Sequence, residues 1–234
     1  MSRTLLLAAC LALTAQAPVQ AQVPNAEVRL KSTFSDGRDD GWLDGRGQDQ
    51  YFWVDPSLGN TAPALHLLQN TDETFAWGIE IENRKPEWLL ALKQGRPVRI
   101  SLDAKAMEVS SWPARLPLPR ELYVEFRDYK APPPGVPYVS VWKRMGVLDQ
   151  RTPEWSRMAA TIDNPLLTNL PPGWGGYGAE DSRGRPLLPE GRTFANVLAN
   201  ADTVVFTTYK PGVAYGWTYW DVLFDNISIR TLQR

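Results

Sequence analysis

The sequence predicts an all-β fold in which two antiparallel sheets pack face to face as a sandwich. Short runs of alternating apolar and polar residues recur along the chain, and Pro, Gly, Asn and Asp separate them. In the clearest run, 98–106, Val98, Ile100 and Leu102 share one face while polar residues occupy the other. Helical periodicity is scarce and strands do not alternate with long helices, which disfavours a parallel sheet. A single two-sheet domain fits this pattern best.

The alternating runs predict strands spread over most of the chain. They lie at 51–54, 64–68, 75–82, 98–106, 122–126, 138–143, 155–162, 203–209 and 222–229. Short helical turns are expected at 193–200 and at 86–92, where Pro86 suits a first turn and Gly95 a C-cap. The segment 163–192 shows no periodicity but is rich in Gly, Pro and aromatic residues, so we expect one long functional loop there.

The first 21 residues have the three parts of a secretory signal peptide. Arg3 supplies the positive charge, an apolar run covers 5–15, and Val19-Gln20-Ala21 supplies the small residues of a cleavage site. We expect residues 1–21 to be removed and 22–234 to form one secreted or periplasmic domain. A lipoprotein processing box at Leu7-Ala8-Ala9-Cys10 is the alternative. No other segment is apolar over the length that a membrane span needs.

Residue counts exclude several classes of site. Cys10 is the one cysteine and lies in the leader, so the predicted mature domain has no disulfide, no thiolate nucleophile and no cysteine-ligated zinc. His66 is the one histidine, and between Leu65 and Leu67 in a strand it is expected to be a hydrogen-bonded structural residue. The formal net charge of −1 gives no reason to propose nucleic acid as a partner.

Ten tryptophans, eight tyrosines and seven phenylalanines are a heavy aromatic load, and part of it should lie on the surface. In the 138–143 run the two valines are expected to face inward, which places Tyr138 and Trp142 together on the other face. Tyr123 has the same outward phase on its own strand. Aromatic rings stack on the C–H faces of sugars, and Glu125 nearby can hydrogen-bond hydroxyls. These residues predict a glycan platform, with packing against a loop as the alternative.

A second aromatic set is carried on glycine-rich backbone in the long loop and before the last strand. It comprises Trp174, Tyr177, Tyr215, Trp217, Tyr219 and Trp220. We expect Trp217 and Trp220 to form a small core under the loop. Trp174 and Tyr177 are the members expected to contact a ligand, because the glycines around them allow the dihedral angles that bring rings close to it.

The last strand carries one carboxylate among apolar residues. Counting by twos from Leu223 places Asp225, Ile227 and Ile229 on one face. A buried carboxylate has to be paired, metal-bound or hydrogen-bonded. Hydrogen bonding to backbone N–H groups at a β-bulge, with Asn226 supporting the turn, is one alternative, and a metal ion is another.

Three stretches resemble secreted bacterial jelly rolls of the galactose-binding-like superfamily, which includes many carbohydrate-binding modules. They are Phe34-Ser35-Asp36-Gly37 followed by Asp40-Gly41-Trp42, then Pro63-Ala64-Leu65-His66-Leu67, and finally 222–229. The same pieces are similar to the laminin domain IV type of β-sandwich found in bacterial envelope proteins. The resemblance implies a jelly-roll sandwich, and it is consistent with glycan binding.

The resemblance also implies a structural calcium ion near the opening strand, bound at the position of Asp225. Asp36, Asp39 and Asp40, together with backbone carbonyls, would help to complete the six to eight oxygen ligands that calcium prefers. Ser35 stands where the family pattern frequently has glutamate, so one family ligand is missing here.

The residues and the resemblance together predict a secreted, non-catalytic protein that binds a polysaccharide or glycoconjugate, with Tyr138, Trp142 and Trp174 as the first residues to test. The first alternative is a structural or adhesive envelope protein whose aromatic surface meets another protein. The second is a polysaccharide lyase or glycoside hydrolase, since Glu80 and Glu82 share a strand face and glycoside hydrolysis needs two carboxylates.

Overall fold

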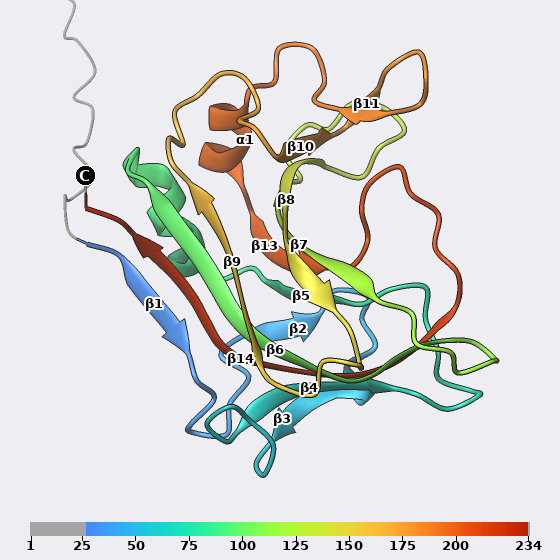
Figure 1. Cartoon of the computed structure of the whole chain (residues 1–234). Helices are drawn as coiled ribbons and strands as arrows, with labels where there is room; N and C mark the ends of the chain where they lie inside the picture. Colours follow the sequence, from blue (N-terminus) through green and yellow to red (C-terminus); the bar gives the residue numbers. More distant parts are fainter. Residues whose placement is uncertain (1–26, 234) are drawn as a thin grey trace, which may run out of the picture.

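The computed structural model describes residues 27–233, so the signal peptide predicted for 1–21 and the lipoprotein alternative at Cys10 lie outside the described residues. Within 27–233 the chain forms two six-stranded antiparallel sheets that pack as a sandwich, together with one small hairpin (Figure 1). The all-β, two-sheet fold predicted from the sequence is confirmed. Among these residues, no helix combines the length and apolarity that a membrane crossing requires.

The first sheet, sheet A, contains the last strand near its centre. Its strands in order are β3 (Phe52–Asp55), β4 (Ala64–Gln69), β14 (Thr218–Thr231), β6 (Val98–Ser111) and β9 (Ser156–Ile162), and β1 (Arg29–Ser32) also pairs with β14. β14 is long enough to pair with β4 along its first half and with β1 along its second half. The first and last strands therefore lie side by side (Figure 1).

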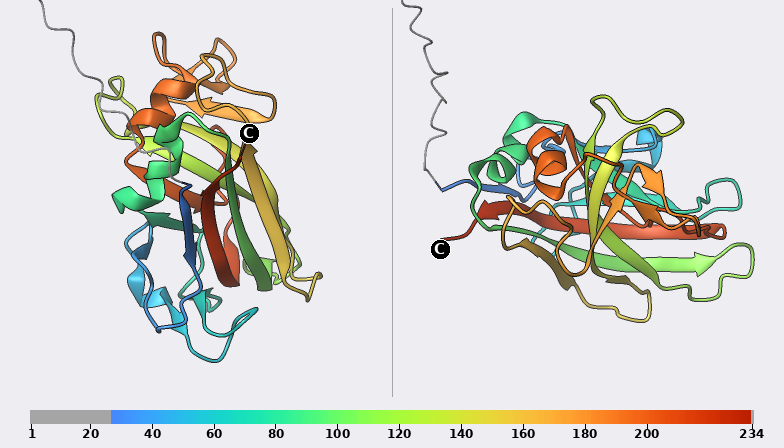
Figure 2. Two further views of the ribbon diagram at one scale, coloured as in Figure 1. Left: turned by 90° about the vertical axis from the view of Figure 1, so that its left-hand side faces the viewer. Right: turned by 90° about the horizontal axis from the view of Figure 1, so that it is seen from above.

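The second sheet, sheet B, also has six strands. Its strands in order are β10 (Trp174–Tyr177), β8 (Val139–Leu148), β7 (Arg120–Asp128), β13 (Thr203–Thr207), β5 (Glu80–Asn83) and β2 (Trp42–Asp44). The small hairpin is formed by β11 (Ala179–Glu180) and β12 (Pro186–Leu187). The helical segments are η1 (Asp49–Tyr51), η2 (Pro86–Gln94) and α1 (Phe194–Asn200). η2 and α1 lie beside each other at one end of the sandwich (Figure 2).

The two helical turns form where the sequence predicts them, although the first is a 3-10 helix. Pro86 opens η2, and Gly95 ends it with a left-handed φ of +64° that a glycine adopts without strain. Thr193 caps α1, because its side chain accepts the N–H of Asn196 at 3.0 Å. Apolar side chains of both segments belong to the core.

The core lies between the sheets and follows from the alternation of apolar residues. Val98 and Ile100 are fully buried, as the period-two pattern predicts. Trp42 of β2 is also fully buried, and its ring centroid lies 5.2 Å from that of Trp88 and 5.3 Å from that of Phe206. Because these rings come from β2, η2 and β13, they join sheet B to the helical end of the sandwich.

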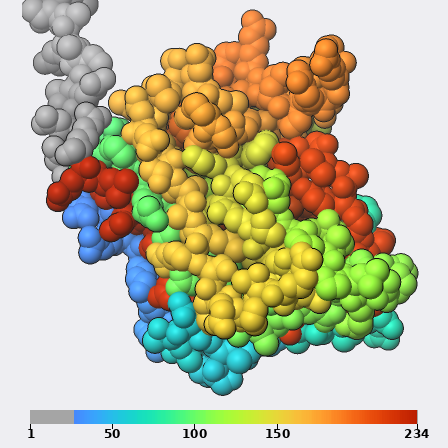
Figure 3. Space-filling model, viewed as in Figure 1, coloured from blue at the N-terminus to red at the C-terminus, as the bar shows by residue number. Residues whose placement is uncertain are grey.

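The segment 163–192 contains more regular structure than the sequence predicts. Trp174–Tyr177 forms β10, an edge strand that pairs with β8, and the β11–β12 hairpin follows it. A four-residue strand is too short for its alternation to be recognised. Figure 3 shows this segment, in gold to orange, as the upper part of the molecule. Its pairing with β8 places part of the segment beside the outer face of sheet B.

A β-bulge in β14 changes which residues face the core. The register with β6 shifts between Asp225 and Ser228, and Asn226 adopts a left-handed φ of +50°. Phe224 and Ile227 both belong to the core, one on each side of the bulge. Asp225 therefore faces away from the core, and the prediction that it shares a face with Ile227 is wrong. Counting by twos fails where the strand contains an extra residue.

Asp225 is nonetheless fully buried, and hydrogen bonds replace water around its carboxylate. Its Oδ1 accepts the N–H of Asn226 at 2.5 Å, and its Oδ2 accepts the N–H of Thr61 at 3.1 Å. The side-chain amide of Asn226 donates to Asp103 on the neighbouring strand at 2.9 Å. The structure thus shows the hydrogen-bonded alternative at a bulge, and these bonds tie the turn at Thr61 to β14.

Replacing Asp225 with Ala should destabilise the fold, because a fully buried carboxylate and its two hydrogen bonds to backbone N–H groups are lost. A hydrogen bond to a charged group contributes about 1.5–3 kcal/mol, so the free energy of unfolding should fall by roughly 2–4 kcal/mol. Asp36→Ala is the matched control, since this carboxylate is exposed and its loss should change stability by less than about 0.5 kcal/mol. Equal stabilities of the two variants in urea unfolding would contradict the role assigned to Asp225.

Candidate functional site

The outer face of sheet B carries many charged and aromatic side chains. The outward residues are Glu80 and Glu82 on β5, Thr203, Val205 and Thr207 on β13, Tyr123, Glu125 and Arg127 on β7, Ser140 and Trp142 on β8, and Gly175 and Tyr177 on β10. On β7 and β8 the residues between them belong to the core. The outward phase that the sequence predicts for Tyr123, Glu125 and Trp142 is therefore what the structure shows.

The strand register brings residues that are distant in sequence into rows on this face. Arg127 lies opposite Ser140, and Ser140 lies opposite Tyr177. In the next row Glu125 lies opposite Trp142. β13 separates β7 from β5, the strand that carries the remaining carboxylates. A side chain as long as that of arginine can reach across one intervening strand.

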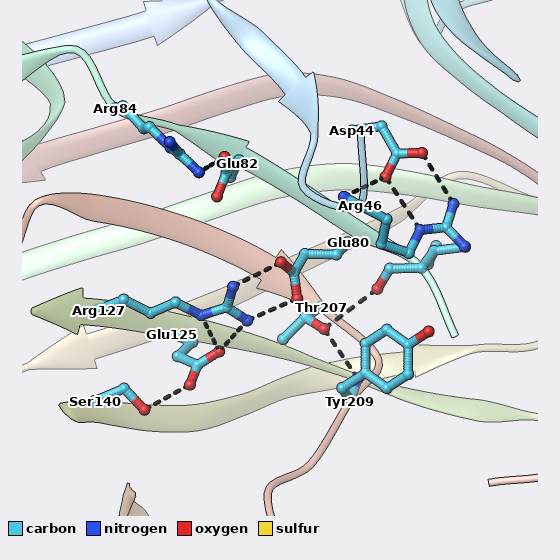
Figure 4. A network of polar contacts seen from close by, with 11 residues as sticks. Asp44, Arg46, Glu80, Glu82, Arg84, Glu125, Arg127, Ser140, Thr207 and Tyr209 are labelled. Atoms are coloured by element: carbon cyan, nitrogen blue, oxygen red, sulfur yellow. Dashed lines mark hydrogen bonds and ion pairs between the residues drawn. The ribbon is translucent and has the colours of Figure 1, made fainter. Parts of the chain in front are cut away.

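Arg127 is the centre of a buried ion network (Figure 4). Its Nη1 and Nη2 atoms donate to the two oxygens of Glu80, each at 2.6 Å. Its Nε and Nη2 atoms donate to Oε2 of Glu125 at 2.9 and 2.7 Å. The Ser140 hydroxyl donates to the other oxygen of Glu125 at 2.5 Å. Two-pronged arginine–carboxylate contacts are strong and directional, so the network fixes β5, β7 and β8 relative to one another.

The three charged groups of the network are shielded from water. The side chains of Arg127, Glu80 and Glu125 are 7%, 8% and 2% exposed. Burial raises the pKa of Glu125, although the Arg127 charge and the Ser140 hydrogen bond act in the opposite direction. Burial also disfavours the charged form of Arg127, but Glu125 and Glu80 more than offset this and hold its pKa above the usual value. Arg127 is therefore a permanent cation that faces two carboxylates.

Tyrosine rings adjoin this network. The ring of Tyr138 covers the Arg127 guanidinium, whose central carbon lies 4.5 Å from the ring centroid, in a cation–π contact. The Tyr138 centroid lies 5.2 Å from that of Tyr177 and 5.5 Å from that of Tyr129. Burial raises the pKa of Tyr138, so its hydroxyl stays protonated at neutral pH. The rings thus cover the ion network and form a continuous aromatic surface.

Beside these rings the surface is hollowed into a recess of about 420 Å³, which we call the sheet B recess. Its lining is Glu80, Arg127, Tyr138, Tyr177, Tyr209, Lys210, Pro211 and Gly212. The last four residues belong to the segment that follows β13. The Tyr209 hydroxyl anchors this segment by donating to the carbonyl of Gly78 at 3.2 Å. The volume lies within the range of small-molecule sites, about 300–1,000 Å³.

Trp142 lies on the same face as the recess but outside its lining. The Nζ atom of Lys210 lies 5.7 Å from the Trp142 ring, and the Tyr123 ring meets it edge-on at 5.5 Å. Gly175 of the neighbouring strand makes room for this indole, because a Cβ at Gly175 would come within 2.0 Å of it. The sequence suggested that glycines act here by adopting unusual dihedral angles. Gly175 acts instead by having no side chain, which leaves space for the Trp142 ring.

The predicted ligand residues lie on this face at different depths. Tyr138 and Tyr177 line the recess and Trp142 adjoins it. Tyr123 and Glu125 are only 2% and 1% exposed, so they support the surface from beneath. Sequence reasoning missed the contribution of the segment after β13, because its irregular backbone leaves no periodic signal.

Trp174 differs from the expectation, because its ring points into the core. The residue is 8% exposed, and its ring centroid lies 5.1 Å from that of Phe194 and 6.4 Å from that of Phe126. Trp174 and Tyr177 occupy opposite faces of β10, which alternates like any strand. The separation could not be predicted, since this segment was expected to be a loop. We therefore leave Trp174 out of the site.

A second aromatic surface lies near the start of β14, and we call it the tryptophan patch. Trp77, Trp112 and Trp217 are 51%, 39% and 42% exposed. The ring of Phe75 joins two of them, at 4.8 Å from Trp112 and 5.0 Å from Trp217. Trp220 is fully buried as expected. Trp217, which we expected in the same small core, is exposed because it precedes the first residue of β14.

His66 is held by polar contacts, as the sequence predicts for a structural histidine. Its Nε2 atom lies 2.8 Å from Oδ1 of Asp221 on the neighbouring strand. Trp53 packs on its imidazole with 4.5 Å between ring centroids. These residues lie on sheet A, away from the sheet B recess.

Two of the residues predicted to bind calcium, Asp36 and Asp225, direct carboxylate oxygens at backbone N–H groups. Asp36 accepts the N–H of Arg38 at 3.0 Å, and both oxygens of Asp225 face backbone N–H groups. The carbonyl of Asp40 accepts the side-chain amide of Asn83 at 3.2 Å. Among residues 27–233, no group of three or more His, Cys, Asp or Glu side chains is placed to hold a metal ion. Carboxylate oxygens that face N–H donors fit a cation poorly.

Several solved structures are similar to this chain at low identity. A CBM22-2 xylan-binding domain from Paenibacillus barcinonensis is 14% identical with a TM-score of 0.47, and the match covers 87% of this chain and 99% of that one. CBM22-1 and GH10 modules of a Clostridium thermocellum xylanase, complexed with xylohexaose, are 12% identical with a TM-score of 0.44. The match covers 89% of this chain but only 29% of that one.

An adhesin domain gives a similar result. The K1 cleaved adhesin domain of Lys-gingipain from Porphyromonas gingivalis is 9% identical with a TM-score of 0.44, and the match covers 88% of this chain and 99% of that one. No protein-family model and no curated protein sequence matches the chain.

Removing divalent cations should leave the melting temperature of the protein unchanged, since N–H donors already satisfy the carboxylates at the predicted calcium position. A cation bound only by the folded state would raise the melting temperature by mass action. Differential scanning fluorimetry with a chelator, and again with added calcium chloride, checks this expectation. A chelator-induced fall that calcium reverses would support the calcium site that the resemblance implies.

Replacing Arg127 with Met should destabilise the protein strongly at neutral pH, because Glu80 and Glu125 would remain buried without their cation. Removing one partner of a buried ion pair costs about 3–5 kcal/mol. Without the Arg127 charge, burial would raise the pKa of the Glu125 carboxyl in the folded variant. The contribution of this group to stability is then fully present below the pKa of an unfolded glutamate, about 4.3, and is lost as the pH rises through the folded-state pKa.

Urea unfolding at about pH 5 and about pH 8 measures this dependence. The free energy of unfolding of the variant should fall further below that of the wild type at the higher pH. Adding Glu80→Gln and Glu125→Gln to the Arg127→Met variant should remove most of the difference, since no buried charge remains. A deficit that is the same at both pH values would contradict the network as described.

Proposed function

We propose that the protein is a secreted or periplasmic glycan-binding protein that holds a polysaccharide or glycoconjugate in the sheet B recess without cleaving it. The observation that carries the proposal is the lining of the recess. It combines the rings of Tyr138, Tyr177 and Tyr209 with the charged groups of Glu80 and Arg127. A sugar presents apolar C–H faces and a ring of hydroxyl groups, so a site of this composition matches both.

The tyrosine rings supply the stacking surface. The rings of Tyr138 and Tyr177 are inclined to each other by 54°, so they present two differently oriented planes to a ligand. Arg127 holds Tyr138 from behind, and the bond to Gly78 holds Tyr209. Rings that are fixed before binding lose little conformational entropy when a ligand arrives, which favours affinity.

Charged groups supply the hydrogen bonds to hydroxyls. Lys210 brings an ammonium group with three donors to the lining. Glu80 adds acceptor oxygens that Arg127 already orients. Hydrogen bonds to charged groups are stronger than those between neutral groups, and their number and direction set which sugar is accepted.

The same network supports binding rather than cleavage. Glycoside hydrolysis needs one carboxylic acid to protonate the leaving group and a second carboxylate across the scissile bond. Here Glu80 and Glu125 direct oxygens at Arg127. Glu82 is paired with Arg84 at 2.7 Å. We therefore assign these carboxylates a positioning role.

Tyr177→Ala should weaken glycan binding with little effect on folding, because Tyr177 lines the recess from the edge strand β10. In affinity gel electrophoresis with soluble xylan, β-glucan or galactomannan, the wild-type protein should be retarded by at least one polysaccharide. The variant should bind that polysaccharide about tenfold more weakly, which corresponds to about 1.4 kcal/mol. Trp53→Ala removes an exposed ring from sheet A and should bind as the wild type does.

Two results would count against the glycan site. One is a folded wild-type protein that none of the polysaccharides retards. The other is equal retardation of the wild type and Tyr177→Ala.

A protein-binding role at the tryptophan patch is the second candidate function. Exposed tryptophans are enriched at the energetic centres of protein interfaces, and three of them gather there. The same electrophoresis separates the two surfaces. Loss of retardation in Trp217→Ala but not in Tyr177→Ala would move the glycan site to the patch, whereas unchanged glycan binding in Trp217→Ala leaves the patch for a protein partner.

A further inference from the structure

Three arginines stand side by side on the outer face of sheet A, on the other side of the sandwich from the sheet B recess. Arg29 on β1 pairs directly with Arg230 on β14, and Arg230 pairs directly with Arg99 on β6. Directly opposed side chains in antiparallel strands have Cβ atoms about 4.5–5.5 Å apart, and like charges at such positions are destabilising. The fold therefore carries a row of cations that costs it stability.

Two further cations and two serines join this row around a recess of about 280 Å³, which we call the arginine recess. Its lining is Arg29, Leu30, Lys31, Arg99, Ser101, Arg157, Ser228 and Arg230. These residues come from β1, β14, β6 and β9, four strands that lie next to one another in sheet A. The recess is thus built from regular sheet, which fixes the spacing of its charges.

The protein compensates only part of this positive charge. Glu27 pairs with Arg29 at 3.2 Å, but both side chains are largely exposed, and such pairs contribute little. Asp103 pairs with Arg157 at 2.8 Å. Within residues 27–233, the lining cations for which no ion pair is found are Lys31, Arg99 and Arg230.

Hydrogen bonds order the polar groups beside these cations. The Nη2 atom of Arg157 donates to the Ser101 hydroxyl at 2.6 Å, and the hydroxyls of Ser101 and Ser228 are hydrogen-bonded at 2.9 Å. Asp103 holds the other end of the Arg157 guanidinium. Arg157 is therefore fixed in place, and the two hydroxyls add hydrogen-bonding groups to the recess.

The chemistry of the lining specifies an anionic ligand rich in oxygen. A guanidinium group presents paired N–H donors that match two oxygens of a sulfate or a carboxylate. The lining holds no aromatic ring to stack on a neutral sugar or a nucleobase, and Leu30 is its one apolar residue. Single-stranded nucleic acid sites depend on stacking, and surfaces that bind membranes add apolar side chains that insert into lipid. The arginine recess has neither feature.

We propose that the arginine recess is a second binding site, which takes the sulfate or carboxylate groups of an acidic polysaccharide. The arginine row crosses three adjacent strands, a distance of about 10 Å at the usual strand spacing. A polymer with repeated anionic groups contacts several of these cations at once and gains from multivalency. The negative charge of such a polymer also offsets the repulsion among Arg29, Arg230 and Arg99, so binding would stabilise an arrangement that is unfavourable without a ligand. The site does not depend on the sheet B recess.

The test compares two variants that each lose two positive charges. Arg99→Gln/Arg230→Gln removes cations from the recess, whereas Arg38→Gln/Arg183→Gln removes exposed cations elsewhere. Dextran sulfate and polygalacturonate are the probes, and unsulfated dextran is the neutral control. The wild type should bind at least one acidic polymer at low salt and lose it as salt rises. The recess variant should bind about tenfold more weakly or worse, and the control variant within about twofold of wild type.

The melting temperature of the recess variant shows whether a loss of binding comes from a loss of folding. Without ligand, the melting temperature of Arg99→Gln/Arg230→Gln should equal or exceed that of the wild type, since like-charge repulsion is relieved. Tyr177→Ala should bind the acidic polymers as the wild type does, so failure at one site is distinguishable from failure at the other.

Several results would overturn the proposal. They are no binding of either acidic polymer at low salt, an equal loss in the two double variants, or equal competition by inorganic sulfate at the same sulfate concentration, which would reduce the recess to a site for single ions. Binding to phosphatidylglycerol vesicles that is as tight as binding to the polymers would assign the recess to a membrane surface instead.

Discussion

The burial of Arg127 between two carboxylates is the constraint on which the outer face of sheet B depends. A guanidinium and two carboxylates taken out of water cost several kcal/mol each unless every charge finds partners of good geometry. The structure meets this demand with residues from three strands, since Glu125 shares β7 with Arg127, Glu80 lies beyond β13 on β5, and Ser140 lies on β8. The strands of sheet B can therefore shift little without exposing an unpaired charge. The outer face of sheet B is therefore rigid, because any other arrangement of its strands would leave a buried charge unpaired at a large cost in free energy.

This rigidity explains how a surface made of tyrosines and charges can serve as a preformed site. Tyr138 is positioned by the guanidinium beneath its ring, and Tyr177 is positioned by the pairing of β10 with the strand that carries Ser140. The segment after β13 then closes one side of the recess with Tyr209 and Lys210. Each wall is thus set by an interaction that exists before any ligand is present, so little binding energy is spent on ordering the site.

The sequence was sufficient for the features that depend on neighbouring residues and insufficient for those that depend on distant ones. Alternation is local, so it predicted the sandwich and the outward phase of Trp142 and Glu125. The bulge at Asn226 reversed the phase of β14 after Asp225; the sequence offered a bulge as one alternative for this carboxylate, but the neighbouring residues alone do not select it over unbroken alternation. The prediction that Trp174 contacts a ligand was wrong for a related reason, because the pairing of β10 with β8 decides which face of β10 packs on the core. The reach of Arg127 across β13 to Glu80 requires the strand order itself.

The two outer faces of the sandwich differ in whether their charges are paired, and burial explains the difference. The Arg127 network on sheet B is paired, whereas the arginine row on sheet A is largely unpaired. In the sheet B network Arg127, Glu80 and Glu125 are nearly inaccessible to water, where unpaired charge is prohibitive, and each has a partner. On sheet A the arginines of β1 and β6 lie in contact with solvent, which screens their repulsion to a tolerable cost. A row of like charges can therefore persist only where water reaches it, and there it remains available to an external anion. This difference in burial fits the two proposals, hydroxyl groups of a glycan at the paired face and anionic groups of a polysaccharide at the unpaired one.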